Sequence, residues 1–322
     1  MQSKMRKETE KKEENSRMLR KARRKRVIKE TATLYLFLLP AIVLLFLFSY
    51  RPMYGVLLAF QDYLPGRPII GEGVRWVGLK YFREFLSNYY FWRLIRNTLV
   101  LSAMSLLFVF PVPIFFALVI NEVPWPKTKK AVQTITYLPH FISAVVVAGM
   151  VSTFLADDGI ITLLLRAIGL EIAGMNINPA AFPWIYTLLK MWQSFGWGSI
   201  LYLSTISSID PGLYEAAEID GASRLKRIWH ITLPALAPII TIQLILHVGG
   251  ILGSDSNLIL LLYSPAIYET ADVIGTFTYR EGLQGGAFSY GTAIGLFMNV
   301  IGFTLVFISN KICDKVTGFS LW

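Results

Sequence analysis

Residues 214–238 read YEAAEIDGASRLKRIWHITLPALAP, a charged, helix-forming stretch that interrupts an otherwise apolar chain. Of the 322 residues, 54% are hydrophobic, and many of them gather in uncharged runs. Each run is near or above the roughly 20 residues with which a helix crosses the hydrocarbon core of a bilayer. The runs are Thr31–Tyr50, Asn97–Asn121, Ala131–Ala156, Met191–Ile209, Ile231–Ser254 and Gly282–Asn310.

Six runs of this length predict six transmembrane helices. A helix satisfies its own backbone hydrogen bonds in lipid, and the sequence has no long alternation of period two that would favour a barrel. The fourth run needs residues 182–189 as well, which places Lys190 inside that helix or at its edge. We therefore expect an all-α membrane protein in which residues 31–322 form one six-helix domain.

Residues 1–30 form a basic tail with 13 lysines and arginines against 5 acidic residues, within a net charge of +10 for the chain. Such a tail could bind nucleic acid or anionic lipid. Basic residues before a first span more commonly mark the cytoplasmic side, so we interpret the tail as a cytoplasmic anchor and expect no nucleic acid partner. With six spans both termini are then cytoplasmic. The single cysteine, Cys313, excludes an intrachain disulfide.

The segments between the runs differ in character. Residues 77–97 predict a short amphipathic helix at the membrane interface, because tyrosine, phenylalanine and tryptophan favour headgroup depth. Residues 157–176 are too charged to cross and predict an outside hairpin, and residues 263–286 predict the last outside loop. Pro111 and Pro113 predict a kink in the second span.

The polar stretch itself has the local signals of two short helices. Asp210 can accept hydrogen bonds from free N–H groups at a helix start, and Pro211 suits the first turn. Gly221 predicts a tight reversal, since glycine accepts a positive φ at little cost. We expect one helix over Leu213–Ile219 and a second over Ala222–Ile231, after which Pro234 opens the next span.

A rigid knob of this kind suits contact with another protein. The small side chains of Ala216, Ala217 and Ala222 would allow a groove to approach closely, and Glu215 could form charge-assisted hydrogen bonds inside it. An ordinary interfacial loop between two spans is the alternative interpretation of the same residues.

The stretch resembles the EAA signature of the membrane subunits of ABC importers. The matching positions are Glu215, Ala216, Ala217, Gly221, Ile231, Leu233 and Pro234. Four further segments resemble the sugar-importer branch, with its maltose permeases and its oligosaccharide permeases of the LplB and YteP kind. These segments are DGA (220–222), RNTL (96–99), YLPHFIS (137–143) and SYGTAIGL (289–296).

The resemblance implies a type I importer permease (MetI-like) fold in a prokaryotic cytoplasmic (inner) membrane, with a coupling loop at residues 210–234. It implies pairing with a second, different permease subunit, an ATPase dimer that binds ATP and Mg, and an extracytoplasmic solute-binding protein. Coupling to the ATPase would involve Glu215, Ala216, Ala217, Asp220, Gly221, Leu233 and Pro234. The sequence has no phosphate-binding loop, HExxH or CxxC motif, so we expect a transport subunit with no catalytic residues, metal or cofactor of its own.

Sugars bind in protected cavities that combine aromatic faces with polar groups. The candidates for the substrate path are Tyr186, Lys190, Trp192, Gln193 and Trp197 in the fourth span, His247, Ser254, Asp255 and Asn257 in or after the fifth, and Asn299 in the sixth. Ionisable groups at membrane depth usually face a cavity or partner, and Lys190 in the path would suit an acidic, uronate-containing oligosaccharide. Lys190 could instead extend to the membrane surface, and the aromatic residues could face lipid or pack.

Three alternatives remain on sequence grounds. The same architecture could import another polar solute, such as a glycerophosphodiester. A membrane-embedded enzyme or assembly factor would need an acid, base or metal cluster, which the sequence does not suggest. A secondary transporter would need an internal repeat with paired broken helices, and no repeat is evident.

Overall fold

The computed structural model describes residues 31–32, 35–169, 174–250, 252 and 256–322. The chain divides into two compact units, residues 1–57 and residues 58–322, the latter called the second unit below. The predicted tail, residues 1–30, lies outside the described residues. The first predicted span forms the helix Tyr35–Phe60, which accounts for most of the described part of the first unit and ends at the start of the second.

Four helices of the described chain are long and apolar enough to cross a membrane: Tyr35–Phe60, Phe91–Asn121, Arg224–Gly250 and Phe288–Thr317. A fifth span results if the bent pair Pro126–Phe141 and Ala144–Phe154 is counted as one. The predicted fourth span forms α9 (Phe182–Ser207), which has 26 residues but is less apolar than the other four. Lys190, Gln193 and Ser194 lie in its middle and account for part of that polarity.

The third predicted span is broken rather than straight. Residues 126–137 form α6 (Pro126–Tyr137), a 3-10 turn covers Leu138–Phe141, and α7 (Ala144–Phe154) follows at an angle of 95°. Pro139 lies in the break and has no N–H to continue the helical ladder. The side chain of Ser143 then caps α7 by accepting a hydrogen bond of 3.4 Å from the Val146 N–H.

The predicted interfacial helix over residues 77–97 is divided in two. Residues 80–86 form α3 (Lys80–Leu86), and Phe91 already begins α4 (Phe91–Met104). The Asn88 side chain accepts a hydrogen bond of 2.9 Å from the Tyr90 N–H in the turn between them. Helix α4 continues through a π turn, η3 (Ser105–Val109), into α5 (Pro111–Asn121). The π turn lies directly before the prolines that predicted a kink.

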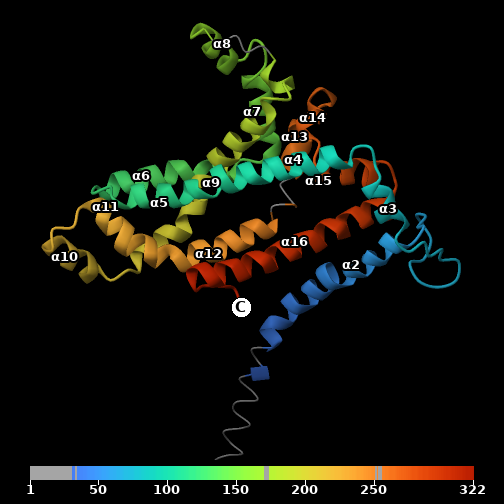
Figure 1. Cartoon of the computed structure of the whole chain (residues 1–322), viewed down its shortest axis with the longest axis horizontal. Helices are drawn as coiled ribbons and strands as arrows, with labels where there is room; N and C mark the ends of the chain where they lie inside the picture. The colour runs from blue at the N-terminus through green and yellow to red at the C-terminus, as the bar shows by residue number, and fades with distance from the viewer. Residues whose placement is uncertain (1–30, 33–34, 170–173, 251, 253–255) are drawn as a thin grey trace, which may run out of the picture. The chain divides into compact units, whose positions relative to one another are not determined.

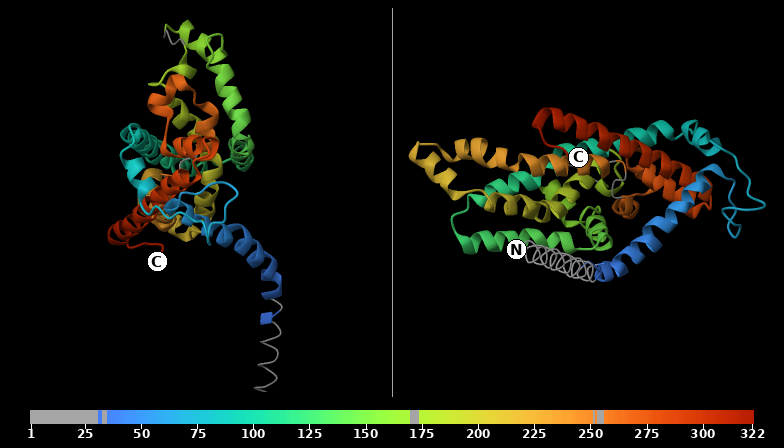
Figure 2. Two further views of the ribbon diagram at one scale, coloured as in Figure 1. Left: turned by 90° about the vertical axis from the view of Figure 1, so that its right-hand side faces the viewer. Right: turned by 90° about the horizontal axis from the view of Figure 1, so that it is seen from below.

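Two helix pairs organise the second unit. Helix α12 (Leu233–Gly250) packs along α16 (Phe288–Thr317), and α5 packs along α9, as Figures 1 and 2 show. A Cβ atom on Gly249 would collide with the Val306 side chain, so a glycine is needed where α12 and α16 approach each other. Buried side chains that include Leu236, Tyr202 and Leu203 pack between α5, α9 and α12.

The predicted last outside loop is helical and contains a buried stretch around residues 271–277. After α13 (Ser256–Leu262), the chain forms η8 (Pro265–Ile267), α14 (Tyr268–Ala271), α15 (Ile274–Phe277) and the π turn η9 (Thr278–Gln284). Ile267, Val273 and Ile274 are each only 1% exposed. The apolar residues of this segment pack into the core. The sequence did not indicate this packing, because turn-forming residues lie between them. The predicted hairpin at 157–176 contains α8 (Ile160–Ala167).

Candidate functional site

The helix–elbow part of residues 210–234 forms as predicted. Helix α10 (Pro211–Ile219) begins after Asp210, whose carboxylate accepts a hydrogen bond of 2.9 Å from the Gly212 N–H. The helix ends at Gly221, where φ is +73°. The Ala222 N–H donates to the Ala217 carbonyl at 2.9 Å, which closes the last turn in the manner of a glycine C-cap.

The second short helix is not a separate element. Ser223 caps α11 (Arg224–Arg227), which runs through the π turn η6 (Ile228–Thr232) directly into α12. Pro234 therefore lies within a continuous helix and does not open a new one, which corrects the prediction. The wider π turn precedes this proline, whose missing N–H leaves one carbonyl of the ladder without its usual donor.

Two side-chain contacts fix α10 against this long helix. Arg227 forms an ion pair of 2.9 Å with Glu218 across the elbow. The Tyr214 hydroxyl lies 2.9 Å from the Thr232 hydroxyl, so the start of α10 is also tied to the long helix. Both contacts span the elbow and connect α10 to α11 and η6, and residues 210–232 are called the knob below.

The outer surface of the knob is apolar at several points. Leu213 is 53% exposed, Ile219 87%, Leu225 69% and Trp229 67%. Glu215 and Ala216 are also exposed on α10, and Ala217 is half-buried. In Figure 1, α10 lies at one end of the second unit, beyond α11. These exposed apolar side chains lie on both α10 and the helix that follows the elbow.

A polar cavity of about 350 Å³ lies among η3, α5, α9 and α12. Lys190 and Ser194 line it from α9, His247 and Gln243 from α12, and Ser105 from η3. The Ser105 hydroxyl lies 3.2 Å from Nε2 of His247. Among the described residues that line the cavity, none is acidic. The remaining lining residues are Val109, Phe110, Pro113, Gly198 and Tyr202.

Two of the substrate-path candidates, Lys190 and His247, thus line one cavity together with three polar residues that sequence reasoning missed. Ser105, Ser194 and Gln243 are polar positions inside long apolar runs, and that signal could have identified them.

The other path candidates lie elsewhere. Tyr186 is buried and stacks with Phe182, and Gln193 donates to the Ile142 carbonyl at 3.4 Å. Trp192 lines a separate apolar cavity of about 490 Å³, and Trp197 stacks on His140 at 4.7 Å. Asn257 and Asn299 line two further cavities, of about 400 and 390 Å³. Ser254 and Asp255 lie outside the described residues.

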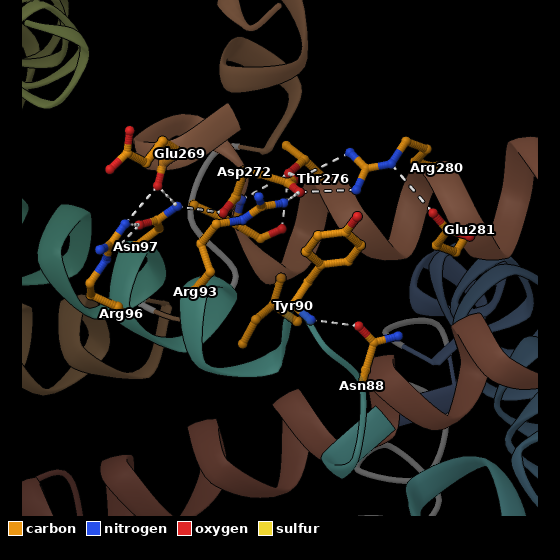
Figure 3. Close-up of polar contacts among 12 residues, drawn as sticks. Asn88, Tyr90, Arg93, Arg96, Asn97, Glu269, Asp272, Thr276, Arg280 and Glu281 are labelled. Atoms are coloured by element: carbon orange, nitrogen blue, oxygen red, sulfur yellow. Dashed lines mark hydrogen bonds and ion pairs between the residues drawn. The ribbon is translucent and has the colours of Figure 1, made fainter. Parts of the chain in front are cut away.

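A charged cluster joins α4 to the helical segment 264–284 (Figure 3). The Asp272 carboxylate is 0% exposed and pairs with Arg93 at 3.1 Å and with Arg280 at 2.9 Å. Thr276 also donates to this carboxylate at 2.9 Å. Burial lowers the pKa of Arg280, but the hydrogen bond and charge of Asp272 outweigh this effect and raise that pKa above its usual value.

The amide of Asn97, the second residue of the RNTL segment, supports the same junction. It donates to the carbonyls of Glu269 and Asp272, both at 2.9 Å. Arg96 donates to the Glu269 carbonyl at 2.7 Å. The RNTL segment therefore connects α4 to α14 through side-chain contacts with backbone carbonyls.

Residues 97–316 match the family model for the binding-protein-dependent transport system inner membrane component. The chain is 41% identical to the polygalacturonan/rhamnogalacturonan transport system permease protein YteP of Bacillus subtilis (strain 168), over 92% of this chain and 94% of that protein. It is 39% identical to Protein LplB of the same strain, over 89% and 90% of the two chains. The crystal structure of a bacterial ABC transporter that imports the acidic polysaccharide alginate has a chain that is 44% identical, with a TM-score of 0.82 over 90% of this chain and 98% of that one.

Proposed function

Because the chain belongs to the family of inner membrane components of binding-protein-dependent transport systems, we propose that it is the permease subunit of an ATP-driven importer of acidic oligosaccharides. The permease role is that of the family, which also fixes the fold as a helical, MetI-like permease fold. The acidic substrate rests on one observation, the cavity that Lys190 and His247 line without any acidic residue among its described lining.

The relatives support the same substrate class. YteP is named for polygalacturonan and rhamnogalacturonan, and the alginate importer carries an acidic polysaccharide. All three are polymers that contain uronate units, so their fragments bring carboxylates as well as hydroxyl groups. A lysine beside neutral hydrogen-bonding groups complements that chemistry. A glycerophosphodiester is less well supported, because no similar protein named above carries one.

The assembly follows from the family and the knob. In this proposal the chain crosses a bacterial inner membrane six times, with α9 and the bent pair as spans and both termini in the cytoplasm. A second permease completes the path, an extracytoplasmic binding protein delivers the sugar, and each knob occupies a cleft of an ATPase subunit. Energy from ATP then reaches the spans through contacts that differ between the two access states.

The test is uptake of labelled trigalacturonate and of its neutral methyl ester by vesicles that carry the complete importer. We expect Lys190→Met to lower uptake of the acid by about tenfold or more, since hydrogen bonds to charged groups are worth ~1.5–3 kcal/mol. Uptake of the ester should change little, and Lys190→Arg should keep most of the acid uptake.

Lys311→Met is the matched control, because Lys311 lies on α16 outside the cavity, over the ring of Phe307. An equal loss for acid and ester in Lys190→Met would refute the acidic-sugar assignment, even if the chain remained a sugar permease.

A further inference from the structure

A second cavity, of about 400 Å³ and open to the surface, lies among α13, α15, η9 and the first turns of α16. It shares no lining residue with the cavity of Lys190. Its volume is within the ~300–1,000 Å³ of typical small-molecule sites. Asn257, Thr278, Tyr279 and Thr292 supply polar groups, and Phe288 adds an aromatic ring.

Two of these polar side chains have hydrogen-bonding capacity to spare. The side chains of Asn257 and Tyr279 are both exposed. Within the described part of the chain, neither the Asn257 amide nor the Tyr279 hydroxyl makes a hydrogen bond. The hydroxyls of Thr278 and Thr292 donate to the carbonyls of Ile274 and Phe288, at 2.8 and 2.7 Å. Each hydroxyl oxygen therefore keeps lone pairs that can accept a further hydrogen bond.

Two glycines, Gly282 and Gly291, are among the residues that line the cavity. A Cβ atom on Gly282 would lie 2.7 Å from Cα of Gly291, so η9 and α16 approach each other backbone to backbone. These glycines serve the close packing of the two elements. Both glycines also line the cavity, so backbone atoms form part of its wall.

The lining chemistry defines the ligand. Among the described residues that line the cavity, none is charged, so the ligand presents a neutral face. Amide and hydroxyl groups suit hydroxyl groups of the ligand, and the rings of Tyr279 and Phe288 suit a flat C–H surface. A pyranose ring has both features.

We propose that this cavity is a second sugar subsite, which binds the uncharged hydroxyl and C–H face of an oligosaccharide through Asn257 and Tyr279. This rests on the proposed function and deepens it. The cavity of Lys190 takes a carboxylate, and the cavity of Asn257 takes a neutral ring face of the same class of substrate.

The experiment uses the complete importer in vesicles, with trigalacturonate and its methyl ester as probes. Tyr279→Leu and Asn257→Leu should each raise the half-saturating concentration of both probes equally, by roughly fivefold, because each removes a neutral contact. Tyr279→Phe should recover most of the Tyr279→Leu defect, since it restores the ring.

Tyr89→Ala is the control, because Tyr89 is an aromatic residue that is 91% exposed and does not line the cavity. The proposal is overturned if Tyr279→Leu and Asn257→Leu stay within twofold of the unaltered importer, or if Tyr89→Ala causes the same loss. In both cases uptake by the unaltered importer still upholds the proposed function. If the unaltered importer takes up neither probe, the proposed function fails and the subsite fails with it.

Discussion

Asp272 illustrates at the residue scale how much a buried charge depends on its partners. Its carboxylate has no exposed surface and lies between two guanidinium groups that come from different elements. Each oxygen is hydrogen-bonded: Oδ1 to Thr276 and Arg280, and Oδ2 to Arg280 and Arg93. A buried charge is tolerated only when its hydrogen bonds are satisfied, and here they are.

We expect Asp272→Asn to lower the free energy of unfolding by about 3–5 kcal/mol, because it leaves the half-buried Arg93 without its counter-ion and leaves Arg280 with only the more exposed Glu281, at 3.4 Å. Thermal unfolding followed by tryptophan fluorescence in detergent measures the change. Arg75→Gln is the control, since Arg75 pairs with Asp62 at 3.6 Å and its side chain is 79% exposed. An exposed pair contributes at most about 1 kcal/mol, so equal shifts in the two variants would contradict this account.

The roles of some residues could be predicted from their neighbours in sequence, and the roles of others could not. Asp210 and Gly221 act on their own neighbours in sequence, so their cap and elbow could be predicted without a fold. Lys190 and His247 are 57 positions apart, and only helix packing brings them to one cavity. For the same reason, the sequence alone could not show that Asn257 and Lys190 line different cavities.

At the scale of elements, hydrophobic runs predicted where helices lie but not how they break. The run over 131–156 contains no lysine, arginine, aspartate or glutamate, yet Pro139 and the Ser143 cap divide it. The segment 263–286 contains serine, proline and charged residues typical of a loop. Its buried charge, Asp272, pairs with Arg93 of α4 and with Arg280 of the segment itself, so the apolar residues around it can enter the core. Such pairing across elements is not visible in one sequence.

This pairing predicts that α4 and the segment 264–284 move as one body during transport. Thr98 lies opposite Ile274, whose N–H donates to the Thr98 hydroxyl at 3.1 Å. We expect a disulfide between Thr98→Cys and Ile274→Cys, in a Cys313→Ala background, to leave sugar uptake by the complete importer within about twofold of the reduced form. Loss of uptake on oxidation, with recovery on reduction, would mean that these elements separate in the cycle.

For the whole molecule, the knob and the cavity of Lys190 lie along the same helix. Helix α12 carries His247 and Gln243 toward its end, and it runs without interruption from α11, where Arg227 holds α10. A displacement of the knob therefore reaches the polar cavity through one continuous helix. A rigid helix transmits a displacement of the knob only if its connection to the knob is also rigid. We therefore expect the elbow at Gly221 to carry the displacement from α10 to the long helix.

Gly221→Pro tests that role. Proline fixes φ near −65°, whereas the elbow requires +73°, so α10 cannot keep its position against α11. We expect the variant to insert in the membrane and the assembled importer to hydrolyse ATP, while sugar uptake falls by about tenfold or more. Glu215→Lys should act in the same direction, because it reverses the exposed charge on α10.

The control is Gly66→Pro, which places the same backbone conflict, at φ +89°, in a loop far along the chain from the knob. Since that loop makes no contact with α10 in the proposed mechanism, ATP hydrolysis and uptake should remain coupled there. Normal uptake by Gly221→Pro would exclude the elbow as the element that carries force to the spans.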